Sequence, residues 1–112
     1  MSKYPFIATY MMASGRNGTL YLGVTSDLRE RVRKHKSDAF DGFSKRYGCK
    51  SLVWFERHHT MEPAIEMETR MKGWKRRWKL AAIEAENPEW RDLSDGWFDE
   101  TVNLWLLDPD TP

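Results

Sequence analysis

A β-hairpin near the start of the chain restricts the possible folds more than any other feature. Residues 6–12 and 19–24 alternate their side chains with the two-residue period of a strand. An Asn-Gly dipeptide at residues 17–18 lies between them and is typical of tight hairpin turns, which need positive φ. The pattern predicts two antiparallel strands, with Tyr10 and Tyr21 as cross-strand neighbours on one face of the sheet.

A positively charged helix is predicted to follow the hairpin directly. Asp27 is a suitable N-cap residue, and Glu30 three positions later resembles the other half of a capping box. Arg31 and His35 are four residues apart and therefore share one side of this helix. The hairpin and the helix can place two phenols and a guanidinium near one point, which suits the handling of a phosphodiester.

The next segments are predicted to be a loop, a strand and a second helix. Residues 37–50 are rich in Gly, Ser and basic side chains, as loops are, and residues 51–55 form a short apolar run typical of a strand. The second helix is predicted to begin at residue 61, because Pro63 suits a first helical turn. One apolar stripe with helical spacing runs along it. The stripe consists of Ala64, Met67, Met71, Trp74 and Trp78.

The end of the chain is predicted to be a further helical piece and a tail. Gly73 is expected to bend or break the second helix, and the piece after it is expected to run to about Ala85 and to end at residues 87–88, Asn-Pro. The remainder mixes acids with apolar side chains and is expected to dock on the body. Its apolar residues are Trp90, Leu93, Trp97, Phe98 and those at 104–107.

The charges are distributed unevenly along the chain. Residues 1–79 contain 17 Lys and Arg against 8 Asp and Glu, a balance of +9, and residues 80–112 contain one Arg against nine acids, a balance of −8. A basic body favours a polyanionic partner, which an acidic tail can shield or orient. The alternative is a solvated surface whose tail packs back on the body.

Cysteine usage and hydropathy point to a cytoplasmic protein. Cys49 is the only cysteine, so an internal disulfide is excluded and a reducing compartment is expected. The sequence has no apolar run that approaches the ~18–20 residues of a membrane span. Residues 1–5 lack the apolar core of a signal peptide.

Each candidate residue of the hairpin and first helix has a chemical and a structural interpretation. Tyr10 and Tyr21 can orient a water molecule, but aromatic pairs across strands usually serve packing. Arg31 offers a phosphate a bidentate positive group, and His35 can assist a proton transfer. Both residues also suit an ordinary solvated helix surface.

Two further sets of side chains lie on the later helices. Glu68 can hold Mg²⁺ together with water and phosphate, or it can form a salt bridge with Lys72 four residues later. Residues 74–79 mix cations with tryptophans, as nucleic-acid-binding surfaces do, although both tryptophans also belong to the apolar stripe. The cations are therefore the better candidates for contact with nucleic acid. These candidates are Lys34, Lys45, Arg46, Lys72, Lys75, Arg76 and Arg77.

The order and spacing of these features resemble the GIY-YIG nuclease superfamily, and most of all its small single-domain bacterial members. The similarity covers about residues 4–80. It rests on Tyr10, Tyr21-Leu22-Gly23, the segment 25–31 that ends in Arg31, His35, and the helix that carries Glu68. The resemblance implies an α+β fold with a small three-stranded antiparallel sheet flanked by helices. It implies a nuclease-like domain at residues 1–86, with residues 87–112 as an acidic, Trp-rich tail packed on it.

The resemblance also implies roles for the matching positions. Tyr10 and Tyr21 would together orient or deprotonate the attacking water, and Arg31 would stabilise the pentacovalent phosphate. Glu68 would hold one divalent ion, Mg²⁺ or Mn²⁺, and His35 matches a frequent but not universal helper.

The chain departs from the family pattern in three places. The first motif reads Ala-Thr-Tyr instead of Gly-Ile-Tyr and the second reads Tyr-Leu-Gly, so both keep the tyrosine, and the second keeps its glycine, Gly23. The family also has a late active-site asparagine, for which this chain offers Asn17, Asn87 and Asn103. Asn87 lies beside a helix-ending proline, which favours a structural capping role for it.

The leading hypothesis is therefore a divalent-metal-dependent endonuclease that hydrolyses DNA phosphodiester bonds, in a process such as repair or recombination. Its cleavage is expected to be structure-selective or weakly specific, and RNA remains open as a substrate. The alternative is a catalytically inactive nucleic-acid-binding module of the same fold. A third hypothesis is a protein-interaction role for the acidic tail. The sequence leaves the oligomeric state open.

Overall fold

An antiparallel sheet forms the centre of the computed structural model, which describes residues 6–37 and 42–98. The described strands are β1 (Ala8–Ala13), β2 (Leu20–Thr25) and β3 (Ser51–Arg57), in the spatial order β2-β1-β3. The connection between β1 and β2 is the predicted hairpin, and Asn17 in its turn has a φ of 56°. The sheet confirms the three-stranded antiparallel arrangement that the sequence predicts.

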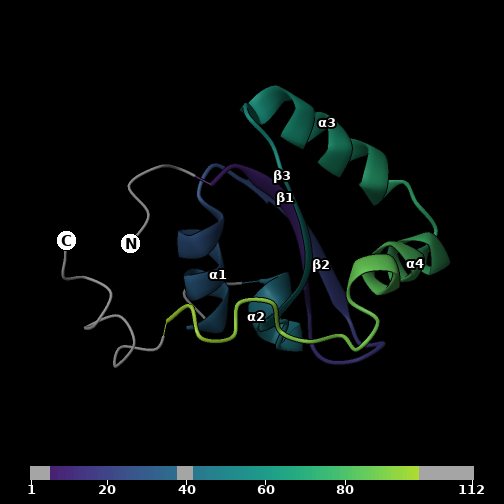
Figure 1. Ribbon diagram of the computed structural model, residues 1–112. Helices are drawn as coiled ribbons and strands as arrows, with labels where there is room; N and C mark the ends of the chain where they lie inside the picture. Colours follow the sequence, from purple (N-terminus) through teal and green to yellow (C-terminus); the bar gives the residue numbers. More distant parts are fainter. Residues whose placement is uncertain (1–5, 38–41, 99–112) are drawn as a thin grey trace.

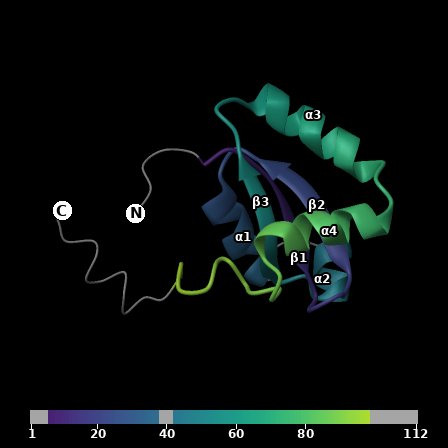
Figure 2. The same ribbon diagram turned by 45° about the vertical axis from the view of Figure 1, so that its right-hand side comes forward.

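Helices flank both faces of this sheet, so the α+β class is confirmed. The described helices are α1 (Leu28–Lys36), α2 (Phe43–Tyr47), α3 (Met61–Lys72) and α4 (Arg76–Glu86). Figures 1 and 2 show α1 on one side of the sheet and α3 and α4 on the other. Among the described residues, no helix is both long and apolar enough to cross a membrane.

The central strand β1 supplies both cores, because its side chains alternate between the two faces. Tyr10 and Met12 point into the core beneath α1, together with Leu28 and Val32 of that helix. Met11 and Ala13 point into the opposite core. That second core also contains Val53, Trp54, Met71, Ile83 and Trp90. All six residues of β1 are buried, as expected for a strand that is paired on both edges and covered on both faces.

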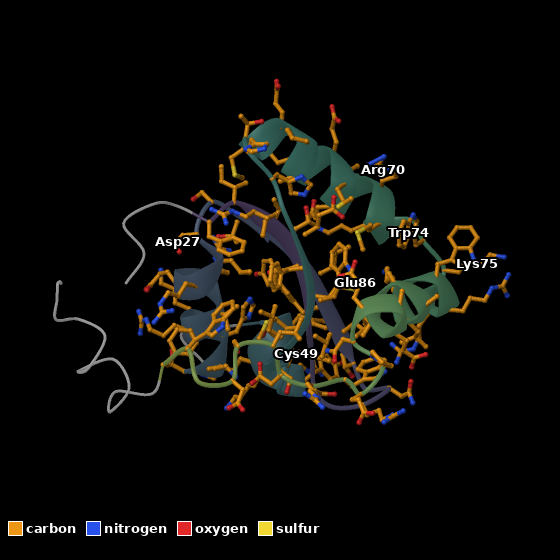
Figure 3. The ribbon with its side chains drawn as sticks, viewed as in Figure 1. Asp27, Cys49, Arg70, Trp74, Lys75 and Glu86 are labelled. Atoms are coloured by element: carbon orange, nitrogen blue, oxygen red, sulfur yellow. The ribbon has the colours of Figure 1, made fainter. Side chains whose placement is uncertain are left out.

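Helix α1 begins where the sequence predicts, but its cap differs in detail. The Asp27 carboxylate accepts a hydrogen bond from the Glu30 amide at 3.2 Å, as an N-cap should. The reciprocal half of a capping box is replaced, because the Asp27 amide donates to Thr25 Oγ1 instead. The Glu30 carboxylate pairs with Arg33 on the same helix. Figure 3 shows Asp27 at the start of α1.

Two sequence expectations about local structure are wrong. The predicted loop at 37–50 contains helix α2, which Gly42 and Gly48 bracket with positive φ angles of 100° and 65°. The apolar stripe does not continue to Trp78, which is 48% exposed. Gly73 ends α3, and the new helix α4 starts at a different angle, so helical periodicity is not carried across the break.

The segment after α4 crosses from one face of the sheet to the other. Trp90 is buried in the core beneath α3 and α4, whereas Trp97 and Phe98 pack against the core beneath α1. Figure 1 shows the segment running from α4 past the end of the sheet to α1. The predicted tail residues at 99–112, including those at 104–107 and Asn103, lie outside the described residues.

Candidate active site

Tyr10 and Tyr21 lie on the same face of the sheet, but diagonally and not directly opposite. Tyr10 pairs with Gly23 and Tyr21 pairs with Met12 in the β1–β2 register. The two ring centroids are 6.2 Å apart with an angle of 37° between the planes. The hairpin therefore brings both phenols together, with one ring offset along the strands from the other.

Gly23 provides the space that Tyr10 occupies. A Cβ atom on Gly23 would lie 2.8 Å from both Cζ and Oη of Tyr10, much closer than ordinary van der Waals contact. The glycine of the second motif therefore has a steric function here. It lets the Tyr10 ring lie flat across the neighbouring strand, and this close approach fixes where the phenol points.

Helix α1 places His35 against the Tyr10 hydroxyl, and helix α2 orients the imidazole from behind. Ser44 Oγ lies 3.4 Å from the carbonyl oxygen of Cys49, and because a carbonyl only accepts, the serine donates there. Ser44 Oγ is then the acceptor for His35 Nδ1 at 2.7 Å. A neutral His35 protonated at Nδ1 has a free lone pair on Nε2, which accepts the Tyr10 hydroxyl proton at 2.8 Å.

Burial determines the protonation of this pair. Burial lowers the pKa of His35 from 6.5 to about 4, and the positive charge of Arg31 acts in the same direction. The ring is therefore neutral at pH 7. Burial also raises the pKa of Tyr10 well above its usual value, with a further upward contribution from Tyr21, while Arg31 acts to lower it. Near neutral pH, Tyr10 is a protonated phenol that donates to a neutral imidazole.

The site has a buried layer and a layer in contact with solvent. Tyr10 is 0% exposed and His35 is 2% exposed. Tyr21 and Arg31 are only partly buried. The Tyr21 ring also contacts the His35 ring, with centroids 4.8 Å apart. Tyr21 and Arg31 therefore form the surface that a ligand can touch, while Tyr10 and His35 support it from behind.

Glu68 lies on α3, and its link to the tyrosines runs through Lys72. Lys72 Nζ is 2.8 Å from Glu68 Oε2, as the spacing of four residues predicts. The Glu68 hydrogen bond and charge raise the pKa of Lys72, and Tyr21 adds a smaller upward contribution. Helix α3 packs against β1 and β2, and Lys72 at its end lies near enough to Tyr21 to feel its charge.

The surroundings of Glu68 fit a divalent ion that keeps most of its water ligands. Among the described residues, no group of three or more His, Cys, Asp or Glu is placed to hold a metal ion. The Glu68 side chain is 15% exposed, and its present partner, Lys72, is a cation. Glu68 would be the protein ligand of an ion such as Mg²⁺ or Mn²⁺, which binds through one or two carboxylates and keeps several waters.

The candidate nucleic-acid contacts are spread over several helices. Lys34 lies on α1, Lys45 and Arg46 lie on α2, Lys72 ends α3, and Lys75, Arg76 and Arg77 lie at the start of α4. Figure 3 shows Trp74 and Lys75 at the junction of α3 and α4. Arg76 has a structural partner, because its Nη2 donates to the carbonyls of Asn17 and Gly18 at 3.0 and 2.7 Å. It braces the hairpin turn from α4.

Asn87 has the capping role that its position beside Pro88 indicates. Its side-chain nitrogen donates to the carbonyls of Val53 and Arg91, and its side-chain oxygen accepts from the Arg91 amide. Asn87 is 4% exposed and belongs to the face covered by α4. These bonds join the end of α4 to β3, on the face of the sheet opposite Tyr10.

Sequence reasoning missed Ser44 because residues 37–50 read as a loop. The hydrogen bond between Ser44 and His35 joins residues nine positions apart on different helices, and no local sequence pattern predicts it. One signal was available. Two glycines enclose five residues with aromatics at both ends, which is a short amphipathic turn and not a random loop.

The fold is a small α+β domain in which β1 and β2 carry the tyrosine pair, α1 carries Arg31 and α3 carries Glu68. The chain matches the GIY-YIG catalytic domain over residues 6–81, and it belongs to that nuclease family. Nucleases of this family act on nucleic acid and generally use divalent metals.

A solved structure supports the fold. The solution NMR structure of a UPF0213 protein from Bacillus halodurans superposes with a TM-score of 0.50 at 22% sequence identity. The match covers 80% of this chain and 95% of that protein. The search of curated proteins gave no match.

Proposed function

We propose that this protein is a divalent-metal-dependent endonuclease that hydrolyses DNA phosphodiester bonds, with selectivity for DNA structure or weak specificity. The observation that carries the proposal is the layered site, in which Tyr21 and Arg31 reach solvent in front of a buried Tyr10–His35 pair.

The two phenols have different tasks in this proposal. Tyr21 contacts the attacking water because it is the phenol that reaches solvent. Tyr10 is a positioning residue, since its proton is donated to His35 and its ring is fixed by Gly23. The Tyr10 oxygen keeps lone pairs that can accept a hydrogen bond from Arg31, and this bond acts to lower the pKa of Tyr10. Tyr10 can therefore hold the Arg31 guanidinium in place.

Arg31 neutralises the negative charge that develops on the phosphate, which a planar bidentate donor does well. The water oxygen bonds to phosphorus while the bond from phosphorus to the leaving oxygen breaks, giving one phosphate monoester end and one hydroxyl end. Glu68 would hold a divalent ion, which would supply Lewis-acid polarisation of the phosphate. Lys72 would compete with that ion for the Glu68 carboxylate, because both are cations.

Cleavage of plasmid and branched DNA in the presence of Mg²⁺ or Mn²⁺ tests the proposal. Wild type should cut, and Glu68→Ala and Arg31→Ala should each lose at least about a hundredfold in rate while binding DNA. Glu66→Ala on the exposed side of the same helix is the matched control and should cut normally. Equal rates for Glu68→Ala and wild type would remove the metal assignment.

A DNA-binding module without catalysis is the second candidate. The closed Glu68–Lys72 salt bridge favours it, because this bond is the ordinary structural use of both side chains. In that case wild type binds DNA but does not cut it with any divalent ion, and Glu68→Ala changes neither property.

A further inference from the structure

Helix α2 exposes its aromatic side chains and buries its small polar one. Phe43 and Tyr47 are 49% and 45% exposed, whereas Ser44 is 4% exposed. The two rings lie one helical turn apart, with centroids 4.7 Å from each other and planes inclined at 46°. They form one continuous aromatic surface, and the contact of α2 with the body is made largely by Ser44.

The same short segment is positively charged. Residues 42–50 contain Lys45, Arg46 and Lys50 and no acidic residue. The Arg46 guanidinium carbon lies 5.6 Å from the centre of the Tyr47 ring. Aromatic rings for base stacking and cations for phosphates are the two components of surfaces that bind single-stranded nucleic acid. A basic surface of this kind is less suited to an ordinary apolar peptide.

This aromatic surface lies beside the candidate active site. Phe43 precedes Ser44 in the chain, and Ser44 Oγ is 2.7 Å from His35 Nδ1. Consecutive Cα atoms are only ~3.8 Å apart, so the surface begins one residue away from the serine that orients His35. Figure 1 shows α2 next to α1, the helix that covers the core containing Tyr10.

We propose that Phe43 and Tyr47 stack on unpaired bases of the DNA strand that is cut, and so direct the enzyme to junctions between duplex and single strand. This inference rests on the proposed nuclease function and specifies its substrate. Paired bases are stacked inside a duplex and cannot cover an external ring, so intact duplex cannot use this surface.

The test compares two labelled DNAs in EDTA, where no cutting occurs. One is a blunt duplex, and the other is the same duplex with a single-stranded tail that carries 2-aminopurine, whose fluorescence is quenched by stacking. For wild type, the tail should increase affinity by roughly tenfold and its 2-aminopurine should be quenched on binding. The double variant Phe43→Ala/Tyr47→Ala should lose both effects and bind the blunt duplex as wild type does.

Two further variants make the result decisive. Phe43→Leu/Tyr47→Leu keeps apolar bulk without an aromatic face, so it should behave as the alanine pair does. Ile65→Ala removes a comparably exposed apolar side chain from α3, at 45% exposure, and should behave as wild type. Circular dichroism of each variant verifies that the fold is kept.

Each contrary outcome has a distinct meaning. A tail that adds no affinity, in a protein that still cuts DNA with Mg²⁺, overturns the stacking inference and leaves the nuclease proposal intact. A leucine pair that binds the tail like wild type shows a surface suited to apolar contact, such as a protein segment, and also overturns it. A protein that neither binds nor cuts any of these DNAs ends the nuclease proposal and the inference with it.

Discussion

At the scale of single residues, the site depends on a close contact between Gly23 and the Tyr10 ring. Gly23→Ala should displace that ring, because the added Cβ would lie 2.8 Å from Cζ and Oη of Tyr10. Overpacking of this kind typically costs about 1–3 kcal/mol in stability. We expect cleavage to fall by at least about tenfold, measured on plasmid DNA beside the free energy of unfolding, because a small misplacement is costly in catalysis.

Gly15→Ala is the matched control for this prediction. A Cβ at Gly15 would meet nothing within 4 Å, although the residue lies in the same hairpin. It should leave both the cleavage rate and the unfolding free energy close to those of wild type. Equal behaviour of the two alanine variants would show that the Tyr10 ring can relax without consequence.

His35 gives a second residue-scale prediction, which concerns pH. Its folded pKa of about 4 lies below the usual 6.5, so the unfolded chain binds the extra proton first as pH falls. His35 should therefore reduce stability progressively below pH 6.5, by about 3 kcal/mol when pH 4 is reached. Denaturant unfolding between pH 7 and pH 4 measures this, and the pH slope should be smaller for His35→Gln.

The tautomer of His35 can be measured directly. Nitrogen NMR of the imidazole should show the proton on Nδ1 in wild type, because Ser44 accepts it. In Ser44→Ala this preference should weaken and cleavage should fall. A wild-type ring protonated at Nε2 would contradict the direction assigned to the Tyr10–His35 hydrogen bond.

These residues also separate what the sequence can reveal from what it cannot. The face shared by Tyr10 and Tyr21 follows from strand alternation, and the Asp27 cap follows from local chemistry, so both were predictable. That Tyr10 is buried and Tyr21 is not depends on how α1 crosses the sheet. Such packing joins distant parts of the chain and leaves no periodic signal.

At the scale of elements, the prediction of α3 was more accurate than that of α2. Helix α3 has twelve residues, enough for its apolar stripe to repeat. Helix α2 has five, too few for a helical period to appear, and its glycine ends resemble ordinary loop residues. The most important contact of α2 is the hydrogen bond between Ser44 and His35. It could not be predicted before the fold was known, because it joins two different helices.

Helix α3 provides a prediction about metal affinity. Lys72 competes with a divalent ion for the Glu68 carboxylate, so Lys72→Ala should bind Mn²⁺ about two- to fivefold more tightly, as expected for the loss of an exposed ion pair. Isothermal titration of the DNA-free protein measures this. Arg70→Ala, an exposed cation on the same helix, should bind as wild type does, and Glu68→Ala should lose the site.

The contact of α4 with the hairpin leads to a prediction about the stability of the hairpin turn. Arg76 donates to the Asn17 and Gly18 carbonyls, so Arg76→Ala should loosen the turn and accelerate hydrogen exchange of the Gly18 amide, which donates to Gly15. Arg77→Ala should leave that exchange unchanged. If Arg77 contacts phosphate, its loss should lower the salt dependence of DNA binding by about one unit of slope. Identical exchange in both variants would contradict the bracing role of Arg76.

At the scale of the whole molecule, the acidic segment that follows α4 is part of the folded body wherever it is described. Asp92 pairs with Lys36 at the end of α1, and the Trp97 carbonyl accepts a hydrogen bond from Arg29. The charge asymmetry of the sequence left two interpretations open, a shield for the basic surface or a tail packed on the body. Residues 87–98 pack on the body, and they neutralise part of the basic face of α1 as they do so.

Asp92 is the centre of this attachment. Its Oδ1 accepts from the Leu52 amide and from the amide and hydroxyl of Ser94, while its Oδ2 pairs with Lys36. Asp92→Asn keeps the shape but removes the charge and turns one acceptor into a donor that faces a cation. We expect a loss of about 1–3 kcal/mol in unfolding free energy, measured by guanidinium titration. Asp95→Asn, an exposed acid in the same segment, should cost much less.

The pH dependence distinguishes this attachment from the buried site. Burial acts to raise the pKa of Asp92, but the bonds from Lys36, Ser94 and Leu52 lower it below its usual 3.8. The stability that Asp92 supplies is therefore complete above pH 3.8 and disappears as pH falls through the lower folded pKa. His35 reduces stability as the pH falls from 6.5 to 4.

Wild type should thus lose stability in two successive stages on acidification. Asp92→Asn should lack the second stage, and His35→Gln should lack the first. If Asp92→Asn instead flattens the pH 6.5–4 range, the two parts of the molecule are not independent, and the segment after α4 controls the burial of the histidine.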